Sequence, residues 1–122
     1  MRVELINTGS ELLMGRVLNT HQQWLGQQLA LAGYELGFQQ TIPDTGKAIQ
    51  SAVSEAIRRS ELVIVTGGLG PTSDDITRHR IAELLGLTLE EHAETRKRIT
   101  AYFQKRMRPM PVIVLQQAQV PR

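Results

Sequence analysis

The stretch Leu62-Val63-Ile64-Val65-Thr66-Gly67-Gly68-Leu69-Gly70-Pro71 decides the fold class. Its first five residues are apolar at nearly every position, as in a strand covered on both faces in the middle of a parallel sheet. Three glycines and a proline then end the strand. A helical pattern follows, with Thr72 or Ser73 as its expected N-cap and Gly86 at its end. This order of strand, turn and helix predicts one βα step of an α/β domain.

The residues before this stretch predict two more such steps. Residues 3–7 alternate like a strand, and residues 34–42 form a second strand closed by Pro43-Asp44. Asn19 is the predicted N-cap of the helix between them. That helix is expected to bury Trp24, Leu25, Leu29 and Ala32. The next helix has the clearest apolar stripe in the chain, formed by Ile49, Ala52, Val53, Ala56 and Ile57.

The residues after the glycines predict a basic amphipathic helix followed by a last strand. The apolar positions of that helix include Ile99, Tyr102 and Phe103, and residues 112–115 look like a strand. The whole order predicts a three-layer α/β/α domain with a mostly parallel sheet and right-handed crossovers. Because a parallel sheet of three or four strands is thin, we expect one domain over residues 1–122 that is incomplete at its C-terminal end.

Composition excludes several classes of protein. The chain has 122 residues, 41% of them hydrophobic, and no cysteine, which excludes a thiolate nucleophile, a disulfide scaffold and a cysteine-ligated metal. No apolar run approaches the ~20 residues of a membrane span, so we expect a cytoplasmic protein and no membrane partner.

The charge is unevenly distributed, although its net value is only +2. That net value makes a nucleic-acid partner unlikely by itself. From Thr95 onward there is no acidic residue, and the basic residues are Arg96, Lys97, Arg98, Lys105, Arg106, Arg108 and Arg122. This segment is suited to phosphates, to an acidic neighbour or simply to water.

Candidate ligand-binding residues lie in the three loops that follow the predicted strands. Ligands of open parallel sheets bind outside the carboxyl ends of the strands. Glycine lets backbone amides approach a ligand closely, and a helix N-terminus suits an anion. The resulting candidates for substrate binding are Gly9, Ser10, Glu11, Thr66, Gly67, Gly68, Gly70, Thr72 and Ser73. The glycines match neither a dinucleotide fingerprint nor a Walker A loop, so a tight turn without a ligand remains the alternative.

Three aspartates are candidates for metal binding or catalysis. Asp74 and Asp75 follow the glycine-rich turn, where a divalent cation such as Mg²⁺ could bridge a carboxylate and substrate phosphates. The spacing from Thr72 to Asp75 equally fits a helix cap. Asp44 follows the second strand and either faces the same crevice or forms an Asx turn.

The segment Thr66-Gly67-Gly68-Leu69-Gly70-Pro71-Thr72-Ser73-Asp74-Asp75-Ile76-Thr77 closely resembles the signature of the CinA family (competence/damage-inducible proteins). The N-terminal domain of that family belongs with the molybdopterin-binding MoaB/Mog domains. Thr8-Gly9-Ser10-Glu11-Leu12-Leu13-Met14-Gly15 resembles the family's opening loop, and Gln117-Ala118 with Pro121 resembles its Gln-Ala…Pro segment. The resemblance runs along the whole chain in order.

The resemblance implies a MoaB-like domain that forms a homo-oligomer, either a dimer or a trimer, and binds a nucleotide or a pterin. In CinA-type proteins this domain is associated with metal-dependent hydrolysis of ADP-ribose, and deamidation belongs to a separate domain that is absent here. By position, Asp75 corresponds to the aspartate after the glycine loop in the Mog pattern, and Asp44 corresponds to the aspartate after the second strand. Two positions depart from the pattern: His21 replaces an asparagine, and residues 112–115 replace a polar stretch.

Three hypotheses about function follow. The first is a metal-dependent ADP-ribose pyrophosphatase in which Asp75, with Asp74, binds the metal and Asp44 orients the attacking water. The second is a molybdopterin- or nucleotide-binding module without turnover. The third is an oligomerising remnant that binds no ligand.

Overall fold

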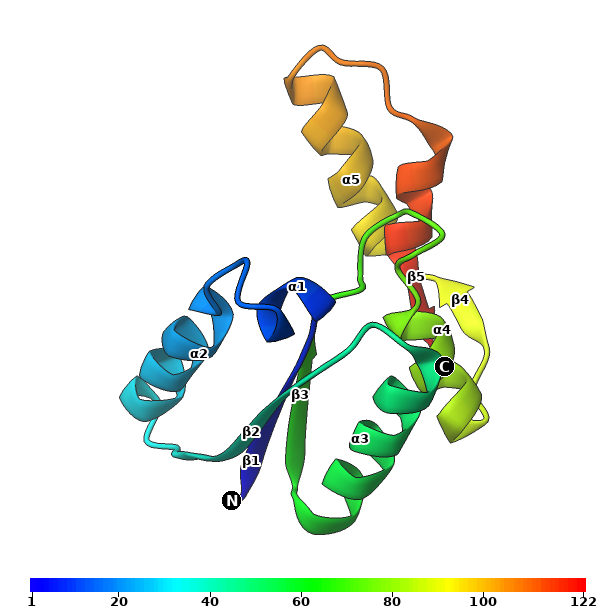
Figure 1. Ribbon diagram of the computed structural model, residues 1–122. Coiled ribbons are helices and arrows are strands. Elements are labelled where there is room, and N and C mark those ends of the chain that lie inside the picture. Colours follow the sequence, from blue (N-terminus) through cyan, green and yellow to red (C-terminus); the bar gives the residue numbers. More distant parts are fainter. The chain divides into compact units, whose positions relative to one another are not determined.

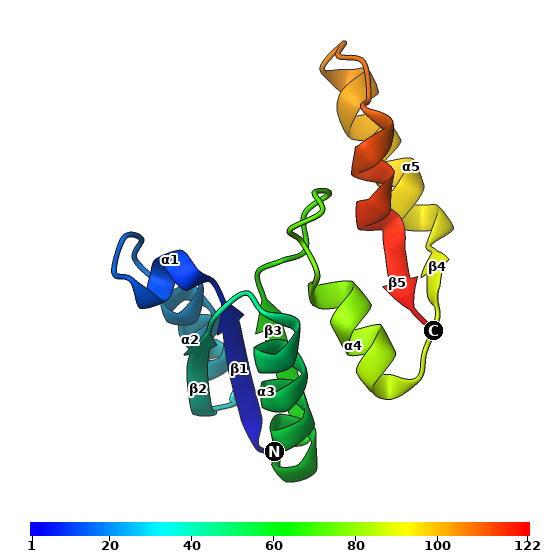
Figure 2. The same ribbon diagram turned by 45° about the vertical axis from the view of Figure 1, so that its right-hand side comes forward.

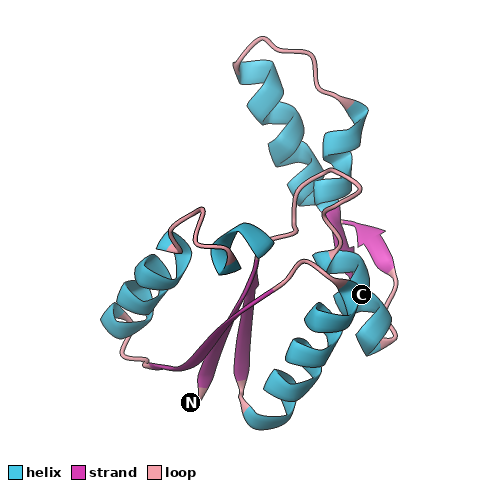
Figure 3. Ribbon diagram, in the orientation of Figure 1, coloured by secondary structure: helices cyan, strands magenta, loops and turns pink.

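The computed structural model describes residues 1–122 and divides the chain into two compact units, Met1–Gly68 and Leu69–Arg122. The division falls inside the glycine-rich turn, and each unit is described by itself. The first unit contains β1 (Val3–Thr8), α1 (Ser10–Leu13), α2 (Thr20–Leu31), β2 (Leu36–Ile42), α3 (Gly46–Arg59) and β3 (Leu62–Thr66) (Figure 1). The second contains α4 (Thr77–Leu85), β4 (Leu89–Glu91), α5 (Ala93–Lys105), the 3₁₀ helix η1 (Val112–Ala118) and β5 (Gln119–Pro121) (Figure 3).

The first unit is built on a parallel three-stranded sheet in the order β2-β1-β3. All six residues of β1 are buried, whereas β3 has one neighbouring strand and its first residue, Leu62, is exposed. The prediction that Leu62–Thr66 is a central strand covered on both faces was therefore wrong. The central strand is β1, and the sequence did not indicate this. Three of its buried residues are polar (Glu4, Asn7 and Thr8), and they interrupt the apolar run typical of a central strand.

Helix α3 packs on this sheet with the predicted apolar stripe. Ile49, Ala52, Val53 and Ala56 are buried, but Ile57 is 47% exposed. At 100° per residue Ile57 lies at the margin of the stripe, so the sheet does not cover it. The helix begins after Thr45, whose hydroxyl accepts a hydrogen bond from the Ala48 amide at 3.2 Å.

Helix α2 begins as predicted but is less buried than predicted. The Asn19 side chain accepts a hydrogen bond from the Gln22 amide at 3.2 Å, which confirms the N-cap. Leu25 and Leu29 are half-buried, whereas Trp24 is 60% exposed and Ala32 is exposed. Trp24 projects about 100° away from Leu25 around the helix axis, so one sheet face cannot cover both.

The second unit contains an antiparallel pair, β4–β5, that the sequence did not predict. Leu89 pairs with Pro121, and Glu91 pairs with Gln119. The two strands have three residues each and are separated by 27 residues in the sequence. Such short strands have too little periodicity to be recognised in sequence. The α/β class with a mostly parallel sheet is nevertheless confirmed, while the boundaries of the single expected domain stay a prediction.

Two segments of the second unit differ from their predicted structure. Helix α4 begins at Thr77 rather than after Thr72 or Ser73, and it ends as predicted at Gly86, whose φ is 66°. Residues 112–115 belong to η1 and are not a strand. Pro111 precedes them, and its carbonyl accepts a hydrogen bond from the Val114 amide at 3.2 Å, which turns the chain into a helical rather than an extended conformation.

The predicted basic helix is confirmed as α5, and η1 runs beside it (Figure 2). Arg96 pairs with Glu91 at 3.0 Å, and the Arg106 guanidinium stacks 3.7 Å from the centre of the Tyr102 ring. Part of the basic charge of this helix is thus engaged within the unit itself.

Candidate functional site

The carboxyl ends of β1 and β3 are tied together by side chains in the first unit. The Thr8 hydroxyl donates to the Thr66 carbonyl at 3.2 Å, and the Thr66 hydroxyl donates to Oδ1 of Asn7 at 2.8 Å. Both threonines lie at strand ends because β1 and β3 pair in parallel, with Asn7 opposite Thr66. The predicted site residue Thr66 is therefore placed at the edge of the sheet where ligands of α/β domains bind.

Gly67 follows β3 and is required by the packing of the strand ends. Its φ is 92°, and a Cβ at this position would lie 2.3 Å from the Thr8 hydroxyl and 2.4 Å from the Thr8 carbonyl oxygen. No real Cβ tolerates such distances to backbone atoms. The glycine is explained by this close approach of two strands, and not only by the approach to a ligand that the sequence suggested.

The opening loop and the loop after β2 lie side by side. The Gly9 amide donates to the Ile42 carbonyl at 3.0 Å, and the Ser10 amide donates to Oδ2 of Asp44 at 3.2 Å. The Asp44 amide reaches the Ser10 hydroxyl at 3.5 Å. The structure therefore brings together three of the predicted site residues, Gly9, Ser10 and Asp44, and uses the Asp44 carboxylate as the acceptor for a loop amide.

A pocket of about 170 Å³ opens at the same end of the sheet, within the first unit. Its lining consists of Thr8, Glu11, Leu12, Val17, Leu18, Thr20, His21, Thr66 and Gly67. The sequence predicted Glu11, Thr66 and Gly67 as site residues, but it did not place Thr8 or Thr20 in a site. His21 was noted only as a departure from a family pattern. The segment from residue 8 to residue 21 forms one wall of this pocket. No local sequence motif predicts that this segment lies beside the strand ends.

The other half of the predicted site lies in the second unit, where Asp75 holds a turn. Its Oδ2 accepts hydrogen bonds from the Thr72 amide at 3.0 Å and from the Thr72 hydroxyl at 2.7 Å. The Gly70 amide also donates to this carboxylate. These bonds, led by the Thr72 hydroxyl and opposed by partial burial, hold the pKa of Asp75 below its usual value. Asp75 is therefore ionised, and it occupies the turn's own amides.

Arg78 holds the same turn from its carbonyl side, and the sequence did not predict this residue. Its guanidinium donates to the carbonyl of Leu69 through Nη1 and to that of Gly70 through Nη2 at 3.1 Å. Its Nε is buried without a hydrogen-bond partner. Burial lowers the pKa of Arg78, and the nearby Asp75 charge opposes this shift. Ser73 and Asp74, by contrast, are exposed.

A divalent metal was predicted at Asp74 and Asp75. Residues 1–122 contain no group of three or more His, Asp or Glu side chains arranged to hold a metal ion. Mg²⁺ is commonly bound by one or two carboxylates together with waters and substrate phosphates, rather than by a protein cage. The ionised Asp75 carboxylate and the exposed Asp74 carboxylate fit that mode of binding.

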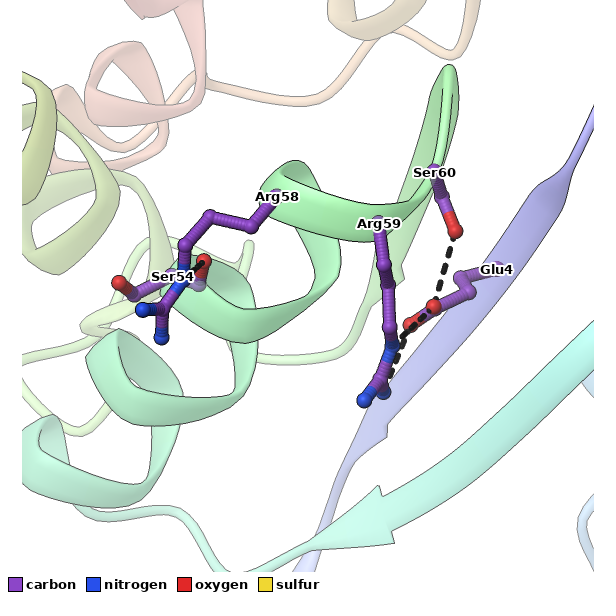
Figure 4. A network of polar contacts seen from close by, with 5 residues as sticks. All are labelled: Glu4, Ser54, Arg58, Arg59 and Ser60. Atoms are coloured by element: carbon purple, nitrogen blue, oxygen red, sulfur yellow. Dashed lines mark hydrogen bonds and ion pairs between the residues drawn. The ribbon is translucent and has the colours of Figure 1, made fainter.

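The amino-terminal half of β1 carries a separate polar cluster (Figure 4). The buried Glu4 carboxylate accepts hydrogen bonds from Nε and Nη2 of Arg59 at 2.5 and 3.1 Å and from the Ser60 hydroxyl at 2.8 Å. The Arg59 guanidinium also lies 4.6 Å from the centre of the Phe38 ring. These contacts satisfy a buried charge and attach the end of α3 to the sheet, so this cluster stabilises the unit.

These observations define an α/β protein with a mostly parallel sheet. A small pocket lies at the carboxyl ends of its strands. Residues 4–122 match the family described as "Probable molybdopterin binding domain", and the chain belongs to this family.

Individual relatives agree with this assignment. A "Putative competence-damage inducible protein" of Caldicellulosiruptor bescii is 46% identical over 99% of this chain and 29% of its own length. The crystal structure of the protein CinA with unknown function from Thermoplasma acidophilum is 29% identical, covers 98% of this chain and 70% of that chain, and superposes with a TM-score of 0.79. The tungsten cofactor synthesizing protein MoaB from Pyrococcus furiosus, 21% identical, shares the fold with a TM-score of 0.64 over 86% of this chain and 63% of that chain. The resemblance to CinA and MoaB/Mog domains is therefore confirmed.

The chain spans about 29% of the length of the C. bescii relative. None of its helices has the length and apolar character needed to cross a membrane.

Proposed function

We propose that this chain binds a phosphorylated heterocyclic molecule, either a nucleotide diphosphate such as ADP-ribose or molybdopterin, at the pocket of the first unit. The observation that supports this proposal is the pocket itself, which lies where parallel strands end. At about 170 Å³ it is smaller than the roughly 300 Å³ of common ligand sites, so it takes one group of such a molecule rather than the whole.

The chemistry of the lining suits a ligand with both polar and apolar parts. The hydroxyl of Thr20 and the imidazole of His21 are hydrogen-bond donors for phosphate oxygens, whereas the Thr8 hydroxyl already donates to the Thr66 carbonyl. The side chains of Leu12 and Val17 offer apolar surface to a ring. Glu11 is the one carboxylate in the lining, and it repels a phosphate but accepts hydrogen bonds from the N–H groups of a heterocycle.

Hydrolysis of the diphosphate is the catalytic form of this proposal. Water adds to one phosphorus, the bridging P–O bond breaks, and two monophosphates leave. Within the second unit, Asp75 with Asp74 is proposed to hold Mg²⁺, a cation that neutralises charge on a diphosphate when bound. Asp44 would orient the attacking water.

A binding module without turnover is the second candidate. It is supported by the hydrogen bonds of both aspartates, because Asp44 and Asp75 already accept bonds from loop amides and serve the loops themselves. Assembly into a dimer or trimer stays a prediction, which the molecular mass of the chain in solution tests.

A titration of the amide signals of the chain tests these proposals. ADP-ribose, with and without Mg²⁺, and a soluble pterin are added to the wild type, to His21→Ala and to His79→Ala. His79 is an exposed histidine of α4 and serves as the control. We expect shifts in the pocket residues and about tenfold weaker binding in His21→Ala, equal to about 1.4 kcal/mol.

The outcomes separate the candidates. Larger shifts with Mg²⁺ at Asp75 and release of AMP would support hydrolysis. Binding of the pterin without metal and without products would support the binding module. No shifts at millimolar ligand would contradict both and leave the remnant hypothesis.

A further inference from the structure

Two threonines that line the pocket of the first unit already use their hydroxyl protons inside the protein. The Thr8 hydroxyl donates to the Thr66 carbonyl at 3.2 Å, and the Thr66 hydroxyl donates to Oδ1 of the fully buried Asn7 at 2.8 Å. Neither hydroxyl can donate to a ligand without breaking one of these bonds. A hydroxyl oxygen that donates its proton still has lone pairs that accept. Thr8 and Thr66 therefore offer a ligand hydrogen-bond acceptors and not donors.

The Glu11 carboxylate adds two acceptor oxygens beside the same strand end. Its Oε1 lies 2.9 Å from the position that a Cβ on Gly9 would take, so the side chain is folded back onto the residue that follows β1. Glu11 lines the pocket together with Thr8 and Thr66. We call these three residues the acceptor side of the pocket.

The side-chain donors of the lining come from a different element. Thr20 and His21 lie at the start of α2, and the lining contains no lysine or arginine. A phosphate group presents negatively charged acceptor oxygens, so it is repelled by the acceptor side and finds side-chain donors only at Thr20 and His21. The acceptor side instead suits a ligand group with several N–H donors.

We propose that the acceptor side selects a heterocycle by an edge on which a ring N–H lies beside an exocyclic amino group, with Glu11 as the specificity-determining residue. This inference rests on the proposed function, because it takes the pocket as the site of the heterocycle and names the ring. It also orients the ligand, since a pocket of about 170 Å³ that takes one group then takes the ring edge and not a phosphate.

The chemistry of a carboxylate explains this selection. Guanine and pterins share an edge with two parallel N–H donors, which match the two oxygens of one carboxylate. Both rings also carry a carbonyl next to the ring N–H, and Thr20 and His21 are donors for it. Adenine presents its amino group beside a ring nitrogen with a lone pair, so it offers one N–H donor and sets that lone pair against the carboxylate.

Two pairs of ligands that differ only at the amino group test the inference. Guanosine monophosphate (GMP) has this group and inosine monophosphate (IMP) lacks it, and lumazine carries a carbonyl where pterin has the amino group. These four ligands and adenosine monophosphate (AMP) are titrated into the wild type, Glu11→Gln and Glu35→Gln, and binding is followed by the amide signals of the chain. Glu35 is an exposed glutamate outside the pocket lining, so its substitution removes the same charge and serves as the matched control.

We expect the wild type to bind GMP about tenfold more tightly than IMP or AMP, the effect of one hydrogen bond to a carboxylate. We expect the same preference for pterin over lumazine. Glu11→Gln should lose most of both preferences, because a glutamine amide keeps only one acceptor oxygen. Glu35→Gln should retain them. If GMP binds more tightly than pterin, the ring belongs to a guanine nucleotide; the reverse order identifies a pterin, and either order supports the inference.

The ligand pairs separate failure of this inference from failure of the proposed function. Equal affinities of the wild type for GMP, IMP and AMP overturn the inference, while the pocket still binds a heterocycle as proposed. A preference that Glu11→Gln retains also overturns it, because another group then recognises the amino group. A wild type whose pocket signals do not shift with any of these ligands or with ADP-ribose contradicts the proposed function, and the inference is rejected with it.

Discussion

The Asp75 carboxylate fills the space that a side chain on Gly70 would need, because Oδ2 of Asp75 lies 2.6 Å from the Cβ position of residue 70. The same oxygen accepts hydrogen bonds from the amide and the hydroxyl of Thr72. The glycine at position 70 therefore makes room for an aspartate of the protein itself. The contact with Asp75 is enough to explain the glycine at position 70, without any contact with a ligand.

Gly70→Ala is expected to push the Asp75 carboxylate away from Thr72. A methyl group at 2.6 Å from Oδ2 is too close, and the carboxylate must move to accommodate it. We expect the pKa of Asp75 to rise toward 3.8, because the bonds that lower it are weakened. Titration of the Thr72 amide signal measures this change.

Gly26→Ala is the matched control, since Gly26 lies in α2 with no heavy atom within 4 Å of its Cβ position. That substitution should leave the Thr72 signal unchanged and stabilise the helix by about 0.5–1 kcal/mol. If Gly70→Ala behaved in the same way, the Asp75 carboxylate would not be held by Thr72.

Gly67→Ala is expected to damage the sheet edge of the first unit rather than a single turn. The φ of 92° costs a non-glycine residue about 1–3 kcal/mol, and contact with the Thr8 backbone adds to that cost. Thermal unfolding should show a clear loss of stability, accompanied by altered amide signals of Thr8 and Thr66. Stability equal to that of the wild type would mean that β1 and β3 do not approach each other this closely.

Glu4→Gln is expected to lower the free energy of unfolding by about 2 kcal/mol. The charged Glu4 carboxylate is buried and accepts three hydrogen bonds. A hydrogen bond to a charged group contributes about 1.5–3 kcal/mol to stability. The glutamine retains part of this network through Ser60. Denaturant unfolding measures the difference.

Arg58→Met is the control for this prediction. Arg58 is the neighbour of Arg59, is exposed, and bonds only to the Ser54 carbonyl of its own helix (Figure 4). Its loss should change stability by less than about 0.5 kcal/mol. An equal loss of stability in both variants would contradict the assignment of the effect to the Glu4 cluster.

The contribution of Glu4 to stability is expected to depend on pH. The Arg59 hydrogen bonds, opposed by burial, hold the pKa of Glu4 below its usual value of 4.5. The folded state therefore binds this proton less readily than the unfolded state, and the stabilisation is fully present above pH 4.5. It is lost as the pH falls below 4.5 through the folded pKa. The difference between the wild type and Glu4→Gln should be constant at higher pH and shrink in this acid range, and an increase there would contradict the sign.

The sequence predicted most elements of the first unit because periodicity and caps are local signals. The stripe of α3 and the Asn19 cap of α2 could be recognised from spacing alone. The order of strands could not, because Glu4 interrupts the apolar pattern of β1 and its partner Arg59 lies 55 residues away. The exposure of Trp24 was also missed, because the burial of a helical side chain depends on which side of the helix packs against the sheet, and that is set by distant residues.

The candidate site was predicted in its residue types and not in its contacts. The glycines, Asp44 and Asp75 were singled out, yet the bonds of Asp75 to Thr72 and of Asp44 to Ser10 show these carboxylates serving loop amides. His21 and Arg78 were missed as site residues because their places depend on how the chain returns after a loop. A capping alternative was open for Asp75, and its bonds to Thr72 resemble one, although α4 begins only at Thr77.

Met107→Gly is expected to stabilise the second unit. Met107 follows α5 with a φ of 51° and is 93% exposed, so its side chain contributes little packing while its backbone adopts the left-handed conformation. That conformation costs an L-residue roughly 1–2 kcal/mol, which exceeds the flexibility that glycine adds to the unfolded chain. We expect a net gain of up to about 1 kcal/mol in the free energy of unfolding, measured by thermal unfolding.

Met14→Gly is the control for this prediction. Met14 caps the end of α1 with a φ of −78° and is 62% exposed, so the substitution to glycine should lower stability instead. A loss of similar size in both variants would show that residue 107 does not hold a left-handed conformation at the end of α5.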